Sequence, residues 1–249
     1  MLRAMEPGQS VDSVDNGHPR QARLDRETIL AMAREIADDG GIGALTLRRL
    51  GRELGADSTA MYRYFRNKAE LLSAMIDQTF YDVPEPDPQG DWRSNLRGLM
   101  AAWWRIYRRH EGLSAVMAGQ PDDEPRLLFL TEWTVRELLR AGIPHDEIGQ
   151  FHQTIYNHTV GSGLVATYSP WRSTRGLRDE QRRIYAALDP EKFPSAAAAA
   201  PTIYPETEDA YLFSLDLLLD AIESRARAAA ESIADFRFPP TSLTPLTSA

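Results

Sequence analysis

The chain has 249 residues, of which 43% are hydrophobic and 26% are charged, and this balance excludes an intrinsically disordered polypeptide. It contains no cysteine, which excludes disulfides, thiolate metal sites and cysteine nucleophiles. Its 36 acidic residues outnumber its 28 basic ones, so only the segment 20–70, with ten basic residues against eight acidic ones, is expected to attract a polyanion.

Residues 1–19 are polar and show no periodicity, so we expect a disordered N-terminal arm that is not a secretory signal. A helical pattern follows Asp25, a residue type that caps helices, and it places Ile29 and Ile36 on one apolar stripe. The glycine-rich run 40–43 is expected to end this first helix.

Two short helices and a longer one are predicted next. Thr46 caps the second helix, and Gly55 ends it. The third helix begins at Asp57 or Ser58 and ends near Phe65, and a turn leads from there into the fourth helix. Three helices within about 45 residues, joined in this way, match a helix-turn-helix, whose third helix presents its outer face to a DNA major groove.

The outer face of that third helix carries side chains suited to DNA. Ser58 and Thr59 offer hydroxyl groups to phosphates, and Tyr62 offers an aromatic ring. Arg63 can form two hydrogen bonds with guanine, and the ammonium of Lys68, at the start of the fourth helix, suits a phosphate. Alternatives remain open for Ser58 as a helix cap only, Tyr62 as a half-buried core ring and Arg63 as a solvated charge.

Four runs in this region resemble the DNA-binding domain of TetR-family transcriptional regulators: LTLRRLG at 45–51, LG at 54–55, MYRYFRNK at 61–68 and LL at 71–72. The resemblance covers 24–80 and extends more loosely over 92–230, where it is similar to a tetracycline-repressor-type C-terminal domain. It implies DNA contacts from these residues: Thr46, Arg48, Ser58, Thr59, Ala60, Tyr62, Arg63, Tyr64 and Lys68. For Tyr64, packing against the first helix is the alternative.

The rest of the chain is also predicted to be helical. Prolines at positions 84, 86 and 88 separate a helix-turn-helix domain at 20–81 from a helical domain at 92–230, which a tail at 231–249 follows. Helices are expected in the second domain at 92–110, 113–117, 124–141, 145–167 and 208–230. A polar segment at 169–183, whose arginines form a solvated face, and a long loop at 189–205 come between the last two. No stretch shows the alternation of apolar and polar residues that is typical of strands, so the predicted class is all-α.

Two of these helices are candidates for a dimer interface. No charged residue occurs from position 148 to 171, which is typical of a helix buried on all sides, and Gly161 and Gly163 allow a second helix to approach. The final helix has an apolar stripe of Leu212, Leu215, Leu219 and Ile222. The resemblance implies that helices 145–167 and 208–230 form a homodimer interface; burial within one subunit is the alternative.

Polar side chains within 148–171 argue against a membrane span, so we expect a soluble, cytoplasmic protein without a membrane partner.

The second domain is rich in aromatic residues, which can line a cavity for an apolar ligand. The residues expected to contact a small hydrophobic effector are Trp103, Met117, Trp133, His152 and Tyr156, with core packing as the alternative for each. Founding members of the resembled subfamily carry a histidine for a metal–tetracycline chelate where this chain reads AVMAG at 115–119. We therefore expect neither a metal site nor a cofactor.

The sequence contains no phosphate-binding glycine loop, no G-x-S-x-G elbow and no H-E-x-x-H motif, so an enzyme is not expected. We expect a homodimeric, ligand-responsive repressor that binds a pseudo-palindromic operator in double-stranded DNA. The alternatives are an activator, a DNA-binding regulator without a ligand or, from a different class, a small-molecule-binding helical protein without affinity for DNA.

Overall fold

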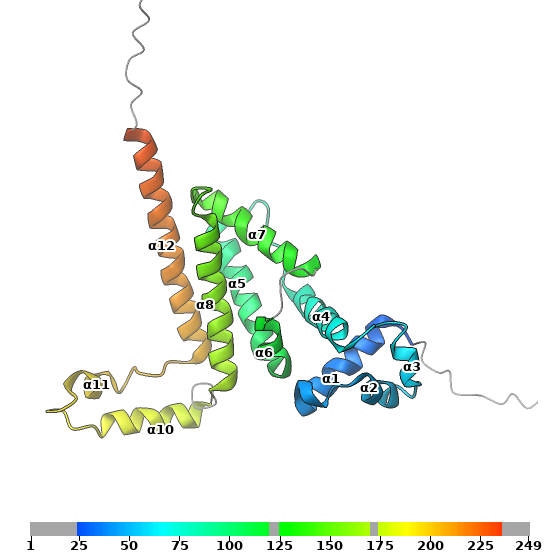
Figure 1. Ribbon diagram of the computed structural model, residues 1–249. Helices are drawn as coiled ribbons and strands as arrows, with labels where there is room; N and C mark the ends of the chain where they lie inside the picture. The colour runs from blue at the N-terminus through cyan, green and yellow to red at the C-terminus, as the bar shows by residue number, and fades with distance from the viewer. Residues whose placement is uncertain (1–23, 120–124, 170–173, 236–249) are drawn as a thin grey trace, which may run out of the picture.

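The computed structural model describes residues 24–119, 125–169 and 174–235, and every regular element in these ranges is a helix (Figure 1). The predicted all-α class is confirmed. The arm predicted at 1–19 and the part of the predicted tail from 236 to 249 lie outside the described residues.

The first four helices lie together at one end of the molecule (Figure 1). They are α1 (Arg26–Ala44), α2 (Leu47–Glu53), α3 (Ser58–Met61) and α4 (Lys68–Thr79). Each begins after a polar side chain that accepts a hydrogen bond from a backbone N–H of the first turn: Asp25, Thr46, Asp57 and Asn67. We expected α1 to end at the glycine-rich run 40–43. The structure shows a break there instead, because Gly41 has a φ of 71°, and the helix then continues to Ala44.

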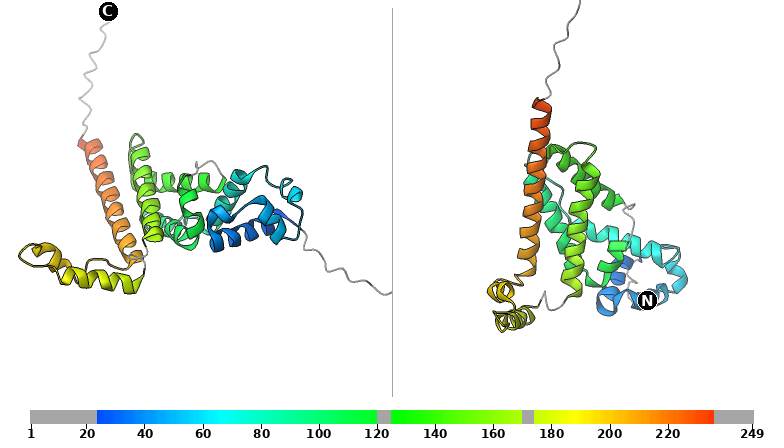
Figure 2. Two further views of the ribbon diagram at one scale, coloured as in Figure 1. Left: turned by 60° about the horizontal axis from the view of Figure 1, so that its bottom comes forward. Right: turned by 60° about the vertical axis from the view of Figure 1, so that its left-hand side comes forward.

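A short 3-10 helix, η1 (Phe80–Asp82), and a proline-containing stretch lead into the second group of helices. These are α5 (Trp92–Arg109), α6 (Glu111–Gly119), α7 (Pro125–Ala141), α8 (Ile148–Tyr168), α10 (Arg175–Ala186), α11 (Pro194–Ala199) and α12 (Thr207–Asp235). Helix α5 is the centre of the group, and α6, α7, α8 and α12 pack against it (Figure 2).

Ion pairs fix α5 and α12 in an antiparallel register. Arg93, near the start of α5, pairs with Asp220 of α12 at 2.6 Å, and Arg105, near the end of α5, pairs with Glu208 at 2.6 Å. Because these side chains are partly exposed, each pair contributes only about 0–1 kcal/mol to stability. Their effect is to select which turns of the two helices face each other.

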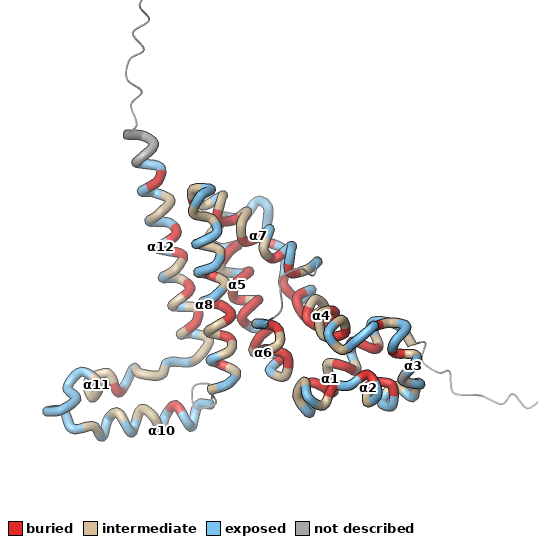
Figure 3. The backbone as a smooth tube through the Cα atoms, in the orientation of Figure 1, coloured by how far each residue is buried: buried red, intermediate tan, exposed pale blue. Residues whose placement is uncertain are grey.

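Helices α8 and α12 lie side by side and bury one face each within the subunit (Figure 3). A Cβ atom at Gly163 would lie 2.8 Å from Cβ of Tyr107, so this glycine lets α8 approach α5 closely. Leu215, Leu219 and Ile222 are buried in the core. The stripe expected to face a second copy is therefore used largely inside the subunit, which was the alternative.

The segment between α8 and α12 differs most from its prediction. Helices α10 and α11 occupy parts of the expected polar segment and loop, and they extend to the side of the α8–α12 pair (Figures 1 and 2). Arg178 is only 5% exposed and pairs with Glu206, so the prediction of a solvated arginine face is wrong at this residue. The physical reason is that α10 packs against the returning chain, whose carbonyl groups at Ile203 and Tyr204 accept hydrogen bonds from Arg182.

Two helix boundaries also differ. The helix expected at 145–167 begins at Ile148, directly after Glu147, whose carboxylate pairs with Arg225 of α12. Helix α12 continues to Asp235, five residues beyond the position where we expected it to end.

Candidate nucleic-acid interface and sensor helices

The turn between α2 and α3 has the geometry of a helix-turn-helix. Gly55 adopts a left-handed conformation with a φ of 63°. The backbone N–H of Gly55 donates to the carbonyl of Arg52 at 3.1 Å, and that of Ala56 donates to the carbonyl of Gly51 at 2.8 Å. This pair of hydrogen bonds is a Schellman motif, which ends α2 and redirects the chain into α3.

Helix α3 is shorter than predicted. It ends at Met61 rather than near Phe65, because the N–H groups of Arg63 and Tyr64 donate to carbonyls three residues earlier and tighten the chain into a turn. Met61 and Phe65 are fully buried and anchor this segment in the core. The backbone of Ser58 lies at the start of α3.

The side chains predicted to read DNA project from this short helix and the turn after it. Tyr62 is 58% exposed, which excludes the half-buried core ring that was its alternative. Thr59 and Arg63 are exposed, and Ala60 is partly buried beneath them. The ion pairs of the described residues do not include Arg63, so its guanidinium is available for a base or a phosphate.

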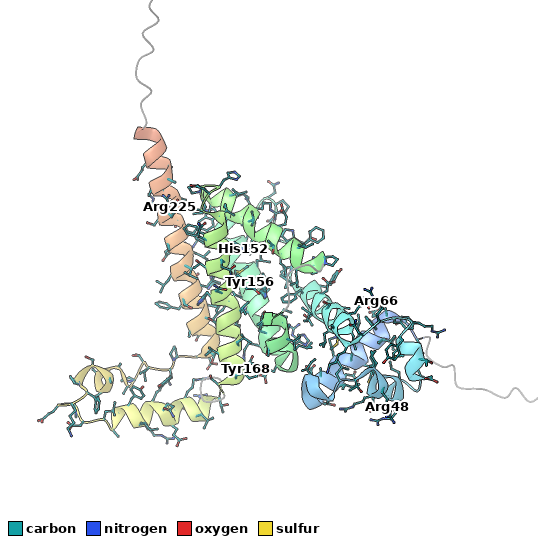
Figure 4. All side chains as sticks on the ribbon, in the orientation of Figure 1. Arg48, Arg66, His152, Tyr156, Tyr168 and Arg225 are labelled. Atoms are coloured by element: carbon teal, nitrogen blue, oxygen red, sulfur yellow. The ribbon has the colours of Figure 1, made fainter. Side chains whose placement is uncertain are left out.

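Helix α2 supplies the neighbouring basic surface. Arg48 is exposed at the edge of the domain (Figure 4). Thr46 is exposed as well, but its hydroxyl accepts a hydrogen bond from the N–H of Arg49 and caps α2. In contrast to Arg48, Arg52 pairs with Glu53 at 3.0 Å.

Two predicted contacts are engaged inside the domain. The hydroxyl of Tyr64 donates to the carbonyl of Leu24 at 2.6 Å, just before α1, which favours the packing alternative for this ring. The ammonium of Lys68 donates to the carbonyl of Ile42 at 2.6 Å and ties the start of α4 to the end of α1. An ammonium has three N–H groups, so Lys68 retains donors for a phosphate.

Four of the five residues predicted to contact an effector belong to two packed aromatic groups. The rings of Trp103 and Tyr156 meet edge to face at 5.6 Å, and His152 stacks on Tyr156 at 6.3 Å; the last two lie one turn apart on α8 (Figure 4). Trp133 lies beneath the guanidinium of Arg126, 4.6 Å from its ring centre, and Met117 is buried.

A cavity of about 450 Å³ lies elsewhere, between α5, α8, α12 and the chain that returns from α11. None of the five predicted effector residues lines it. Its walls include residues that sequence reasoning did not select, namely Trp104, His158, Tyr204 and Tyr211. A signal was present: His158, Gly161, Ser162 and Val165 form a mixed polar and small stripe at helical spacing along an otherwise apolar stretch.

The outer face of the α8–α12 pair exposes large apolar side chains. Phe213 is 67% exposed and Leu217 is 53% exposed, one turn apart on α12, and Val165 of α8 is also exposed. Among the described residues, no helix combines the length and the hydropathy of a membrane span, and no group of three or more His, Asp or Glu residues is arranged to hold a metal ion.

Two family descriptions match the sequence. "Bacterial regulatory proteins, tetR family" matches residues 29–75, and "Tetracyclin repressor-like, C-terminal domain" matches residues 83–226. The second match alone spans more than half of the chain.

Individual proteins agree with these matches. The transcriptional repressor DrrR1 of Streptomyces coeruleorubidus is 27% identical over 209 residues, which are 80% of this chain and 77% of that protein. The crystal structure of apo ActR from Streptomyces coelicolor superposes with a TM-score of 0.72 at 21% identity, over 84% of this chain and 99% of that one. ActR in complex with actinorhodin gives a TM-score of 0.69 at 22% identity, over 82% and 99% of the two chains. At these identities the likeness to ActR shows the fold alone.

Proposed function

The chain belongs to the TetR family of bacterial regulatory proteins, and from this premise we propose that it is a homodimeric repressor whose affinity for an operator is lowered by a small molecule. As a member of this family it is a DNA-binding regulator of transcription. Its place of action is then the cytoplasm, where bacterial DNA lies.

The observation that carries the proposal is the exposed surface after the α2–α3 turn. Tyr62 and Arg63 project from that turn, and Arg48 lies on the adjoining helix. A guanidinium and an aromatic ring at the end of a short helix suit base edges in the major groove, and Thr59 and Lys68 suit the phosphates on either side.

Dimerisation is supported by the outer face of α8 and α12. One helix-turn-helix reads only a few base pairs, and two copies related by a two-fold axis read a pseudo-palindrome. Phe213 and Leu217 are large exposed apolar side chains on α12, and burying them against a second copy would remove them from water.

The response to a ligand is supported by the α5–α8–α12 cavity and by the family. The related ActR was crystallised with actinorhodin, which makes a small-molecule effector a reasonable proposal for this chain too. A ligand that binds the DNA-free state more tightly would shift the dimer towards that state.

An in vitro selection tests the proposal. The full-length protein is incubated with random DNA duplexes, and the retained duplexes are sequenced. We expect a pseudo-palindromic consensus whose half-sites lie about one helical turn apart. Retention of duplexes without a common sequence, or no retention, would contradict a sequence-specific regulator.

Two arginine variants then test the reading surface on the selected duplex. Arg63→Ala should weaken binding about 10-fold or more and relax the preference at one base pair of each half-site. Arg52→Ala is the matched control, because Arg52 is also exposed but pairs with Glu53, and it should bind nearly as the parent does. Equal losses of DNA affinity in both variants would show that binding depends on the basic charge and not on the position of Arg63.

A further inference from the structure

Helices α4 and α7 cap each other where the two groups of helices meet (Figure 1). The carboxylate of Asp77, in the last turn of α4, accepts a hydrogen bond at 2.7 Å from the backbone N–H of Arg126, the second residue of α7. In return, the guanidinium of Arg126 donates to the carbonyl of Phe80 at 3.1 Å and to that of Val83 at 2.5 Å, just beyond the end of α4. A carboxylate at a helix N-terminus and a guanidinium at a helix C-terminus both complement the helix dipole. We call these contacts of Asp77 and Arg126 the α4–α7 interlock.

Aromatic rings keep the Arg126 side chain in this position. Its guanidinium lies 4.6 Å from the ring centre of Trp133, which is buried, and 5.2 Å from that of Tyr81 in η1. The ring faces attract the cation, and the planar guanidinium reaches two fixed carbonyls at the same time. An ammonium lacks this planar set of donors, so the interlock depends on arginine and not only on positive charge.

The interlock and a second contact together fix the first group of helices on the second. At the second contact Gly112 of α6 lies against α1, since a Cβ atom at Gly112 would be 2.4 Å from the carbonyl oxygen of Ala37. A rigid body that is held at one point can still turn about that point. Hydrogen bonds are directional, so those of the interlock oppose this rotation.

Helix α4 connects the interlock to the DNA-reading surface. It has 12 residues, so it is about 18 Å long. Its first residue, Lys68, follows the turn that exposes Tyr62 and Arg63, and the ammonium of Lys68 is hydrogen-bonded to Ile42 at the end of α1. A rotation of about 10° at the interlock would move the other end of α4 by about 3 Å, which is close to the rise of about 3.4 Å between successive base pairs. A small change in the interlock is therefore large enough to change which base pairs the two copies reach.

From these observations we propose that the α4–α7 interlock determines the spacing of operator half-sites that the dimer accepts, with Arg126 and Asp77 as positioning residues. The exposed side chains after α3 select the base pairs, and the interlock selects how far apart the two half-sites lie. Neither Arg126 nor Asp77 contacts the DNA. The inference rests on the proposed function, because only a dimer that reads two half-sites has a spacing to select.

The first test measures the binding of the full-length protein to the selected duplex and to duplexes with one base pair inserted or removed between the half-sites. The parent should bind the altered duplexes about 10-fold or more weakly than the selected one. Arg126→Gln removes the charge and the planar set of donors, so this difference should fall to about threefold or less. A loss of stability alone would weaken binding to all the duplexes equally and leave their ratio unchanged. An unchanged ratio in folded Arg126→Gln would overturn the proposal.

Arg105→Gln is the matched control. Arg105 pairs with Glu208 at 2.6 Å and joins α5 to α12 inside the second group of helices, away from the interlock. The control should keep the spacing preference of the parent. The same loss of preference in Arg105→Gln would show that the effect does not come from the interlock. Circular dichroism confirms that each variant is folded.

Two variants of Asp77 test the other half of the interlock, also if Arg126→Gln does not fold. Asp77→Asn keeps an oxygen that accepts from the N–H of Arg126, and asparagine caps helices well, whereas Asp77→Ala has no acceptor. Asp77→Ala should lose the spacing preference, and Asp77→Asn should keep it within about twofold of the parent. Equal spacing preferences in the two variants would contradict the role of this hydrogen bond.

A distance measurement without DNA separates this proposal from the proposed function. The chain has no cysteine, so Asp39→Cys, at an exposed position of α1, gives one attachment point for a spin label in each copy. Double electron–electron resonance then measures the distances between the two labels of a dimer. We expect a narrow distribution for this protein and a broad one when Arg126→Gln is added. The absence of any dipolar coupling would contradict the dimer and both proposals, whereas equally narrow distributions would contradict the interlock alone.

Discussion

Gly55 determines the geometry of the α2–α3 turn. Its φ of 63° lies where a side chain is strained, by about 1–2 kcal/mol for an ordinary residue. Gly55→Ala should therefore lower the free energy of unfolding by about that amount, measured by urea denaturation. Gly43→Ala is the control, because Gly43 has no such conformation and a Cβ there meets nothing within 4 Å. A loss of the same size in the control would show that the turn is not the cause.

Two histidines are expected to make the protein less stable in mild acid. Burial lowers the pKa of His110 below its ordinary value of 6.5, and burial also lowers the pKa of His158. Above about pH 6.5 both rings are neutral in the folded and the unfolded chain. As the pH falls below that value the unfolded chain takes up protons first, so stability falls until the lowered folded pKa is reached.

His110→Gln tests this assignment. The charged groups that act on the pKa of His110 are Asp38 and Arg34 of α1, Arg109 at the end of α5 and Asp82 of η1, and the Nδ1 atom of His110 has no partner among the described residues. The melting temperature of the parent should fall between pH 7 and pH 5.5, and the fall should be smaller in the variant. The carboxylates with lowered pKa start from ordinary values of 3.8–4.5, so their contribution comes at lower pH. An equal fall in the variant would exclude His110 as a source.

Helix α12 has two apolar faces with different uses, and substitutions separate them. Phe213→Glu together with Leu217→Glu places charges on the exposed face, so the double variant should stay folded and elute as a monomer in size-exclusion chromatography. Leu219→Asp places a charge in the core, so it should unfold the subunit rather than only separate the dimer. A double variant that remains a dimer would place the interface on another surface.

The two groups of helices are joined at two places, one by close backbone contact and one by hydrogen bonds. Helix α6 begins against α1, and a Cβ atom at Gly112 would overlap the carbonyl oxygen of Ala37. A second junction is Arg126 of α7, whose N–H donates to Asp77 of α4 at 2.7 Å and whose guanidinium donates to the carbonyl of Phe80 at 3.1 Å. With two such junctions, we expect the groups to unfold in one step.

Gly112→Ala should weaken that coupling. All tryptophans follow position 91, so tryptophan fluorescence reports on the second group of helices alone, while circular dichroism reports on both. The two thermal transitions should coincide in the parent. In Gly112→Ala they should separate, with a loss of about 1–3 kcal/mol from overpacking. Gly98→Ala, in α5 with open space around its Cβ position, should leave them coincident.

The helix-turn-helix was largely predictable because its signals are local. Caps, left-handed glycines and a 3.6-residue period each involve neighbours in the chain, and Asp25, Thr46 and Gly55 behave as their sequence context indicates. Local signals do not show contacts with distant partners: the hydroxyl of Tyr64 donates to the carbonyl of Leu24, and the ammonium of Lys68 donates to that of Ile42.

The sequence by itself therefore determined the helical class, the family and the helix-turn-helix, since each depends on short-range spacing of residue types. The tertiary structure decided which face of α12 is core, which of the adjacent Trp103 and Trp104 lines a cavity, and that Arg178 is buried. Helical periodicity shows that a face is apolar but not what covers it. The answer depends on the packing of helices far apart in the chain, and only their arrangement in space supplies it.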